Sequence, residues 1–305
     1  MKILILDSSY LIYKSYFGMK NKHLKVERDG EEINTSAIFG FLRETLNLIT
    51  EERYNFIISV NDTPPYYKKK LYRDYKKRPD KGLVIPSFHD ERELIQAILY
   101  DLGIPTFFCN GYEGEEIAHT LIKRLSNHKV DLYTSDEDCY ALLYDHVQLI
   151  KTNKGDIIKF GLDDLQEKYH VDRKQFTIFK ALTGCKSDNI PSINGVGPVT
   201  ASKLINEHGS MKNIIKHVDD ITQEKLRKNF KKAIKSGLLN RAMKLTKIEV
   251  PQKLNKYEAK ETLTYKDILE WIDAQSFLGG TNKLLLRNLQ RTQKKNLKNI
   301  MEEIC

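Results

Sequence analysis

The first half of the chain alternates short apolar runs with longer amphipathic segments. The apolar runs predict four β-strands, at residues 2–6, 56–60, 104–109 and 130–134. The segments between them carry apolar side chains at helical spacing, and the helix around Ile98 should end at Gly103. Strands that alternate with helices are typical of an α/β fold, here with a mostly parallel central sheet flanked by helices.

The second half of the chain has a different pattern. The turn Asn153-Lys154-Gly155 predicts a β-hairpin, and from about Phe176 onward the chain is largely helical and rich in lysine. We therefore expect three regions: an α/β core over residues 1–172, a helical region over 173–250 and a basic helical extension over 251–305.

Nothing in the sequence indicates export or insertion into a membrane. No apolar run approaches the roughly 18 residues needed to span a bilayer. The chain opens on a short apolar run without the basic start and cleavage site of a secretory signal. The cysteines are too widely spaced for a zinc knuckle: Cys109, Cys139, Cys185 and Cys305. We expect an intracellular protein with reduced thiols.

The formal net charge of +9 favours a polyanionic partner, most commonly nucleic acid. A lysine-rich surface without such a partner would have the same net charge. Much of this charge lies between residues 68 and 81, where tyrosines are interleaved with lysines and arginines. Aromatic rings among cations suit the bases and phosphates of an unpaired strand. A solvated charged helix would have the same composition.

Acidic residues follow three of the predicted strands. Asp7 follows the first strand, Asp62 closes the second, and Asp136 and Asp138 follow the fourth. Ligands of open α/β sheets bind beyond the carboxyl ends of the strands. These carboxylates should therefore meet at one edge of the sheet.

A further acidic group begins the helix that follows the third strand. It comprises Glu113, Glu115 and Glu116, of which Glu113 and Glu116 should share one helix face. So many carboxylates repel one another unless a cation intervenes. Mg²⁺ and Mn²⁺ take oxygen ligands, and a cluster of this size predicts two ions about 4 Å apart that clamp a phosphodiester and activate water. Each acid taken singly could instead cap a helix or lie in solvent.

Two closely spaced glycines precede a predicted helix in the second half. Gly195 and Gly197 permit a tight turn, and Pro198 suits the first turn of the helix that follows. The free amides of that turn, together with Lys203, suit a phosphate. The pattern is typical of a helix-hairpin-helix, which grips duplex backbone without reading bases, although an ordinary loop would also fit.

Four stretches together make the chain resemble the 5′-nuclease family: the 5′→3′ exonuclease domain of bacterial DNA polymerase I, the phage 5′ nucleases and the flap endonucleases. The likeness spans about residues 1–250 and rests on residues 111–116, 134–138, 181–189 and 195–201. It implies a PIN-like fold with a helical arch over about residues 64–93. It also implies metal-dependent 5′→3′ exonuclease and flap-endonuclease activity on DNA 5′ flaps, nicks or 5′ ends, with RNA primers on DNA as further substrates.

The resemblance also implies roles for individual residues. One metal site would contain Asp7, Asp62, Glu113 and Glu115, and a second Glu116, Asp136, Asp138 and Asp188. Lys14 and Lys76 would offset the charge of the reacting phosphate as catalytic residues. The implied DNA contacts are Tyr13, Lys68, Arg73, Tyr75, Arg78, Gly195, Gly197, Thr200 and Lys203. The hairpin would also bind K⁺ through backbone carbonyls, and we expect a monomer.

Two departures from the family pattern bear on the metal sites. The family has aspartates where this chain has Glu115 and Glu116, and another where it has Cys185. An added methylene moves a carboxylate by about a bond length, and a thiol is a poor ligand for Mg²⁺. The expected outcomes are an active nuclease that prefers Mn²⁺, or a catalytically weakened paralogue that binds branched DNA. A ribonuclease of the PIN-type fold is a further alternative, which the hairpin and the basic arch disfavour.

Overall fold

The structure is a computed structural model of residues 1–305. It describes all of them except residues 20, 29, 78–85, 260–266, 268–279 and 305. Within the described residues, none of the helices combines the length and the apolar character needed to cross a bilayer.

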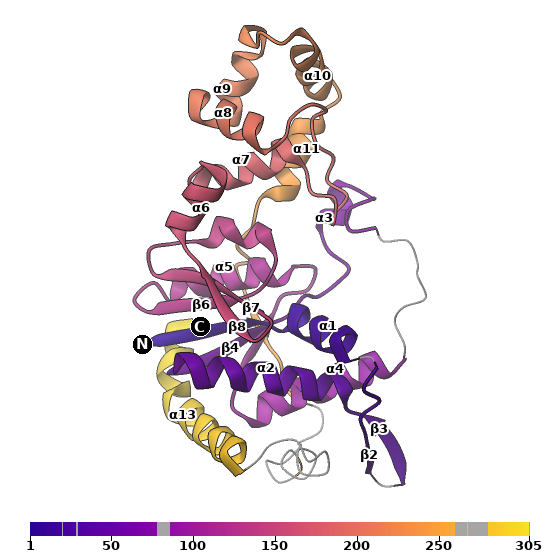
Figure 1. Ribbon diagram of the computed structural model, residues 1–305, viewed down its shortest axis with the longest axis vertical. Helices are drawn as coiled ribbons and strands as arrows, with labels where there is room; N and C mark the ends of the chain where they lie inside the picture. The colour runs from indigo at the N-terminus through magenta and orange to yellow at the C-terminus, as the bar shows by residue number, and fades with distance from the viewer. Residues whose placement is uncertain (20, 29, 78–85, 260–266, 268–279, 305) are drawn as a thin grey trace.

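A mostly parallel sheet forms the centre of the protein, as the sequence predicts (Figure 1). Strand β1 pairs in parallel with β4 on one side and β6 on the other, while the outer strands β8 and β9 run antiparallel to their neighbours. The order across the sheet is β8 (Asp156–Phe160), β7 (Val147–Asn153), β6 (Lys129–Tyr133), β1 (Lys2–Asp7), β4 (Phe56–Val60), β5 (Thr106–Phe108) and β9 (Asn255–Lys256). The hairpin expected around Asn153 is the turn between β7 and β8.

Helices cover both faces of the sheet, because alternate side chains of each strand point to opposite faces. Ile3 and Ile5 pack in the core under α5 (Gly114–Arg124), whereas Leu4 and Leu6 pack in the core of the other face. That second core is closed by α1 (Ser8–Met19), α2 (Ser36–Glu52) and α4 (Pro86–Asp101). The central strands are buried on both faces, which is why their sequences are continuous apolar runs.

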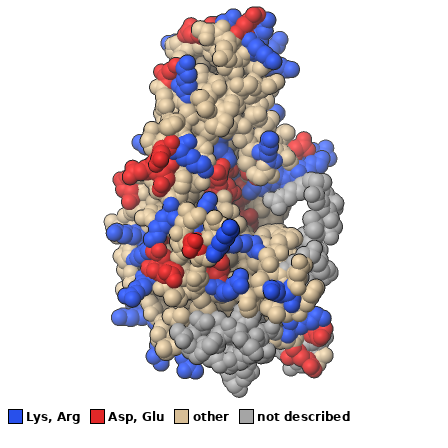
Figure 2. Space-filling model, viewed as in Figure 1, with Lys and Arg blue, Asp and Glu red and all other residues tan. Residues whose placement is uncertain are grey.

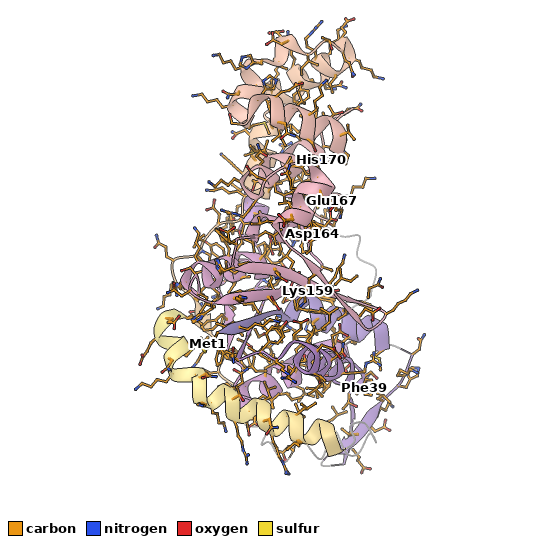
Figure 3. The ribbon with its side chains drawn as sticks, turned by 60° about the vertical axis from the view of Figure 1, so that its left-hand side comes forward. Met1, Phe39, Lys159, Asp164, Glu167 and His170 are labelled. Carbon is orange, nitrogen blue, oxygen red and sulfur yellow. The ribbon has the colours of Figure 1, made fainter. Side chains whose placement is uncertain are left out.

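A group of helices rises beyond the carboxyl ends of the central strands (Figure 1). It is continuous with the core under α5, through aromatic contacts such as Tyr140 with Phe176 and Tyr169 with Phe179. Figure 3 shows α6, with Asp164 and Glu167, between the sheet and the upper helices. The elements are η1 (Glu137–Leu142), α6 (Leu162–Tyr169), α7 (Arg173–Thr183), α8 (Pro198–His208), α9 (Met211–Lys216), η2 (Val218–Asp220), α10 (Glu224–Lys235) and α11 (Leu238–Thr246).

The end of the chain, for which the sequence predicts a basic helical extension over 251–305, contains a short strand as well as a long helix. Strand β9 adds an antiparallel edge to the sheet beside β5. Helix α13 (Gly280–Ile304) runs along the base of the sheet domain (Figure 3) and contributes Leu286 and Leu289 to one core and Ile300 and Ile304 to the other.

Two further segments differ from the sequence-based expectation or are described only in part: the segment before α2 and the expected arch. A hairpin of β2 (Lys25–Arg28) and β3 (Glu31–Asn34) precedes α2 where the sequence predicted no strand. In the segment expected to form a helical arch, the structure describes only the short helix α3 (Lys68–Leu71), the turns that follow it and the start of α4. Residues 78–85, including Arg78, lie outside the described residues.

Candidate metal centre

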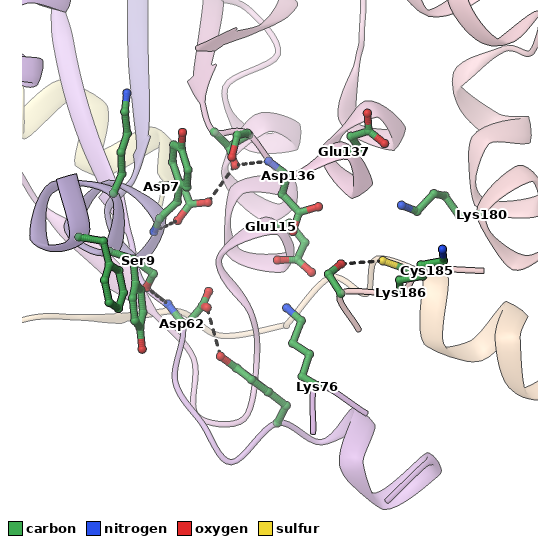
Figure 4. A pocket seen from close by; sticks show the side chains of 18 of the residues that line it. Asp7, Ser9, Asp62, Lys76, Glu115, Asp136, Glu137, Lys180, Cys185 and Lys186 are labelled. Atoms are coloured by element: carbon green, nitrogen blue, oxygen red, sulfur yellow. Dashed lines mark hydrogen bonds between the residues drawn. The ribbon is translucent and has the colours of Figure 1, made fainter. Parts of the chain in front are cut away.

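The carboxyl ends of β1, β4 and β6 open into a cleft of about 950 Å³ (Figure 4). Asp7, Asp62 and Asp136 line this cleft together with Glu115, which comes from the first turn of α5. Figure 2 shows acidic side chains in the hollow between the upper helices and the sheet domain, with lysines and arginines around it. The structure therefore brings together four carboxylates from segments far apart in the sequence.

Hydrogen bonds fix the side chains of the two aspartates at the ends of β1 and β4. Asp7 accepts hydrogen bonds from the Tyr10 amide at 2.9 Å and the Thr134 hydroxyl at 2.9 Å. Asp62 accepts hydrogen bonds from the Gly114 amide at 2.6 Å and the Tyr66 hydroxyl at 3.1 Å. Sequence reasoning assigned no role to Thr134, Tyr66 or Gly114, because isolated hydroxyls and glycines carry no spacing signal.

Gly114 lies directly against the carboxylates of Asp62 and Asp7. A Cβ atom at this position would approach Asp62 Oδ1 to 3.1 Å and Asp7 Oδ1 to 3.7 Å. A glycine here lets the start of α5 come within hydrogen-bonding reach of the carboxylates. The adjacent Glu115 is thereby placed beside Asp7 and Asp62 in the same cleft.

The crowding of these acids alters their protonation. Burial and the neighbouring Asp62 carboxylate raise the pKa of Asp7 to about 7. Burial and the charge of Asp138 raise the pKa of Asp136 to about 6. Burial and the charge of Glu113 raise the pKa of Glu115 well above its usual range. Each shift marks a buried negative charge without sufficient compensation, which is the environment that a divalent cation stabilises.

A second group of possible ligands lies where η1 meets the turn after α7. One ligand atom each from Asp138, Cys185 and Asp188 lie within 4.8 Å of one another. Lys180 on α7 approaches Asp138 Oδ1 to 2.7 Å. Burial and the Asp138 and Asp188 carboxylates raise the pKa of the Cys185 thiol.

Glu113 and Glu116 lie on the same side of the start of α5, as expected, and Lys68 contacts both of them. Glu113 is the N-cap of α5, and Glu116 accepts a hydrogen bond from the Glu113 amide at 3.1 Å in a capping box. Both side chains are fully buried, and neither is among the described residues that line the cleft.

Two lysines, Lys68 and Lys76, lie against these glutamates. The Lys68 ammonium lies 2.8 Å from Glu113 Oε2 and 3.6 Å from Glu116 Oε1, and Lys76 forms an ion pair with Glu113. Burial alone would raise the pKa of Glu113, but the charges of Lys68 and Lys76 outweigh it and lower the pKa to about 2. Tyr67 and Tyr75 donate hydrogen bonds to Glu116 and Glu113, respectively, and the Glu249 amide donates a further one to Glu116 at 3.4 Å.

This buried pairing gives a stability prediction. Lys68 is 2% exposed, so Lys68→Met should leave the acids around it uncompensated and lower the free energy of unfolding by about 3–5 kcal/mol. The neighbouring Lys69 is exposed, and Lys69→Met should change it by less than about 0.5 kcal/mol. Urea denaturation of both variants in metal-free buffer measures the difference. Equal stabilities would show that Lys68 does not compensate the buried glutamates.

Two of the residues that we expected to contact DNA are buried. Lys68 and Tyr75 are 2% and 1% exposed and hydrogen-bond to Glu113, so they are unavailable to DNA in this structure. Arg73 is exposed. Tyr13 is 42% exposed at the cleft and packs against Phe88 with ring centroids 4.7 Å apart.

The two lysines expected to act on the phosphate both line the cleft, but each is engaged. Lys76 is paired with Glu113, as above. Lys14 donates hydrogen bonds to Glu44 Oε1 at 2.8 Å, the Tyr133 hydroxyl at 2.8 Å and the Thr152 hydroxyl at 2.6 Å. Sequence reasoning missed this network, because its members come from four separate elements.

The glycine hairpin forms the turn expected of it. Gly195 has a positive φ of 87°, and Gly197 is the N-cap of α8 with Pro198 in the first turn. Val199 is 84% exposed, so the start of α8 faces solvent. Thr200 is half-buried, and Lys203 is exposed one turn further on.

Comparison with known proteins gives consistent matches over most of the chain. A family model for the N-terminal resolvase-like domain of 5′-3′ exonucleases matches residues 2–170, and one for their C-terminal SAM fold matches residues 171–266. A 5′-3′ exonuclease of Aquifex aeolicus is 31% identical over 302 residues, which cover 94% of this chain and 98% of that protein. The thermostable DNA polymerase I of Thermus thermophilus is 28% identical over 263 residues, and this chain spans only 30% of its length.

Solved structures show the same fold. The T5 5′-exonuclease with bound divalent zinc ions has a TM-score of 0.68 and 18% identity, with both chains fully covered. The catalytic core of Rad2 in complex with DNA substrate has a TM-score of 0.58 and 19% identity, over 93% of this chain and 91% of that one. Since the family models together match residues 2–266 and a relative covered over 98% of its length is 31% identical, this chain belongs to the 5′-3′ exonuclease family.

Proposed function

We propose that this protein is a divalent-metal-dependent 5′→3′ exonuclease and flap endonuclease that hydrolyses DNA phosphodiesters at 5′ flaps, nicks and 5′ ends. RNA primers annealed to DNA are further substrates of the same site. The observation that carries the proposal is the convergence of Asp7, Asp62, Glu115 and Asp136 in one cleft, with raised pKa values for three of them. We place the protein inside the cell and expect it to act as a monomer.

The residues of the cleft fit divalent cations. Asp188 is 5% exposed, and burial raises the pKa of its carboxyl group even though the charge of Lys76 opposes this shift. Asp7, Asp62 and Glu115 would hold one ion, and Asp136, Asp138 and Asp188 the other, with Mg²⁺ or Mn²⁺ as the ions. Bound there, they would lower the pKa of the attacking water and stabilise the departing oxygen.

Other side chains of the cleft would bind the phosphate and the unpaired strand. Lys14 and Lys76 place two ammoniums at the cleft, where they would offset the charge of the phosphate. The Glu44, Tyr133 and Thr152 contacts hold Lys14 in one orientation. The exposed ring of Tyr13 at the mouth of the cleft is suited to stack on an unpaired base.

Duplex DNA would be held by the upper helices. The amides at the start of α8, after Gly195 and Gly197, are suited to a backbone phosphate, with Lys203 adding a cation nearby. Such a contact fixes the duplex without reading its sequence, which suits an enzyme that recognises the shape of a 5′ end. We expect K⁺ to bind the carbonyls of this hairpin.

A cleavage assay tests the proposed activity. The metal-free protein with Mg²⁺ or Mn²⁺ should release short products from a 5′-labelled DNA flap, leaving a 5′-phosphate and a 3′-hydroxyl, and a chelator should stop the reaction. An all-RNA substrate of the same sequence should be cut poorly, and preferential cleavage of that RNA would favour a ribonuclease. Tight flap binding without product under either ion would identify a non-catalytic junction-binding protein and contradict the proposal.

A further inference from the structure

Two aromatic side chains of α1 lie exposed at the cleft. Tyr13 and Phe17 are one helical turn apart, so they project from the same face of the helix. Both line the cleft, and they are 42% and 46% exposed. Single exposed apolar residues are common on protein surfaces, but neighbouring ones that share a cleft indicate a binding site.

The rings of Tyr13 and Phe17 are nearly parallel. Their centroids lie 6.3 Å apart, and the angle between the ring planes is 11°. A base stacked on Phe17 would therefore lie nearly parallel to a base stacked on Tyr13, as successive bases of one strand do. Inside a duplex, each base is covered on both faces by its neighbours, so this pair of rings suits the bases of an unpaired strand.

Neighbouring aromatic side chains hold both rings in place. Phe88 of α4 is 3% exposed and lies against Tyr13, with ring centroids 4.7 Å apart. Tyr16 is 6% exposed and meets Phe17 edge to face, with centroids 5.4 Å apart. Tyr16 also contacts Phe88 at 5.0 Å, which closes the group. Rings fixed in this way lose little conformational freedom when a base stacks on them.

The opposite face of α1 is packed on α2. Ser15 and Met19 lie on that face, because each is more than half a helical turn from Tyr13 and Phe17, respectively. Both are buried, and a Cβ atom at Gly40 of α2 would lie only 2.9 Å from Ser15 Cβ. Helix α1 therefore cannot turn its aromatic face away from the cleft without separating from α2.

We propose that Tyr13 and Phe17 together form a stacking platform for two successive unpaired bases of the DNA 5′ strand, with Phe17 as the second ring. The inference rests on the proposed function in taking DNA as the ligand. The platform and the carboxylates of Asp7 and Asp62 line one cleft, so a strand held on the rings lies beside the proposed ions. Stacking on aromatic rings tolerates any base, which suits an enzyme that recognises a 5′ end by its shape.

Binding of a 5′-flap DNA to the full-length protein in Ca²⁺ measures the contribution of Phe17. Phe17→Ala should weaken binding by roughly 5–150-fold, the effect of losing one stacked base. Phe17→Leu keeps an apolar side chain without an aromatic face and should lose most of this affinity, whereas Phe17→Tyr should retain it. The matched control is Tyr100→Ala, because Tyr100 is 41% exposed on α4, is not among the described residues that line the cleft, and should leave the affinity unchanged.

A single abasic nucleotide, moved along the flap, identifies the base that stacks on Phe17. At one unpaired position it should weaken binding by the parent protein but should have no further effect on Phe17→Ala. The adjacent position should behave in the same way towards Tyr13→Ala. An abasic effect of this kind in the template strand, and not in the flap, would contradict the assignment to the 5′ strand.

The inference is overturned by a Phe17→Ala or Phe17→Leu variant that binds the flap as tightly as the parent protein. Thermal unfolding verifies that each variant is folded, as expected for substitutions of an exposed side chain. Flap cleavage in Mg²⁺ or Mn²⁺, measured in parallel, separates the two proposals. Cleavage by the parent with unchanged affinity in Phe17→Ala would refute the platform alone, and the platform without cleavage in any divalent ion would refute the nuclease activity alone.

Discussion

Asp7→Asn should lower the rate of flap cleavage by roughly a thousandfold or more, while the affinity for the flap changes little. Asp7 lies at the end of the central strand and shares the cleft with Asp62 and Glu115. An amide cannot replace the charge of the carboxylate, although it fills the same space and its single oxygen can keep one of the two hydrogen bonds that Asp7 accepts from the Tyr10 amide and the Thr134 hydroxyl. The loss should therefore fall on catalysis and not on folding or DNA binding.

Single-turnover cleavage and a binding titration in Ca²⁺ measure these quantities separately. Asp163→Asn is the matched control, because Asp163 is an exposed residue of α6 outside the cleft, and it should cleave at the parent rate. Cleavage by Asp7→Asn within about tenfold of the parent rate would mean that the cleft carboxylates do not hold the catalytic ions.

The metal-free protein should lose stability as the pH rises from about 4 to about 7. The pKa of Asp7 is about 7 and that of Asp136 about 6 in the folded chain, against an ordinary value of 3.8. The folded state therefore binds more protons than the unfolded state within this window, and stability falls as those protons leave. Each unit of pKa difference corresponds to about 1.4 kcal/mol, so the combined effect should reach several kcal/mol.

Urea denaturation at a series of pH values in a chelating buffer measures this slope. Asp7→Asn should flatten it and should raise the stability of the metal-free protein above pH 7. At that pH, a divalent ion at about a hundred times its Kd should restore about 2.7 kcal/mol to the parent protein. A metal-free protein whose stability is constant or rises over this window would contradict the shifted pKa values.

The strands and the acidic residues that follow them could be predicted from the sequence, because both leave a local pattern in it. Strands buried on both faces, such as β1 and β4, need continuous apolar runs, and these are visible in the sequence. In a parallel sheet, residues that follow such strands meet at one edge, which is why Asp7, Asp62 and Asp136 were grouped correctly. The departure at Cys185 was equally visible, because it depends on residue identity alone.

The features that could not be predicted from the sequence depend on contacts between segments that are far apart in the chain. Lys68 looked like an exposed arch cation, and only the fold shows it beside Glu113, 45 residues away. Nothing in the local sequence distinguishes Lys68 from the exposed Lys69. Strand β9 has two residues, too few to show a period, and it forms only because the edge of β5 is free to pair.

The central claim is that carboxylates from separate strands and from α5 hold divalent ions in one cleft. Anomalous diffraction from crystals soaked in Mn²⁺ tests it most directly. Peaks should appear between Asp7, Asp62 and Glu115, and between Asp136, Asp138 and Asp188. Saturating Mn²⁺ that gives no peak in the cleft, or peaks only at surface carboxylates elsewhere, would contradict the account.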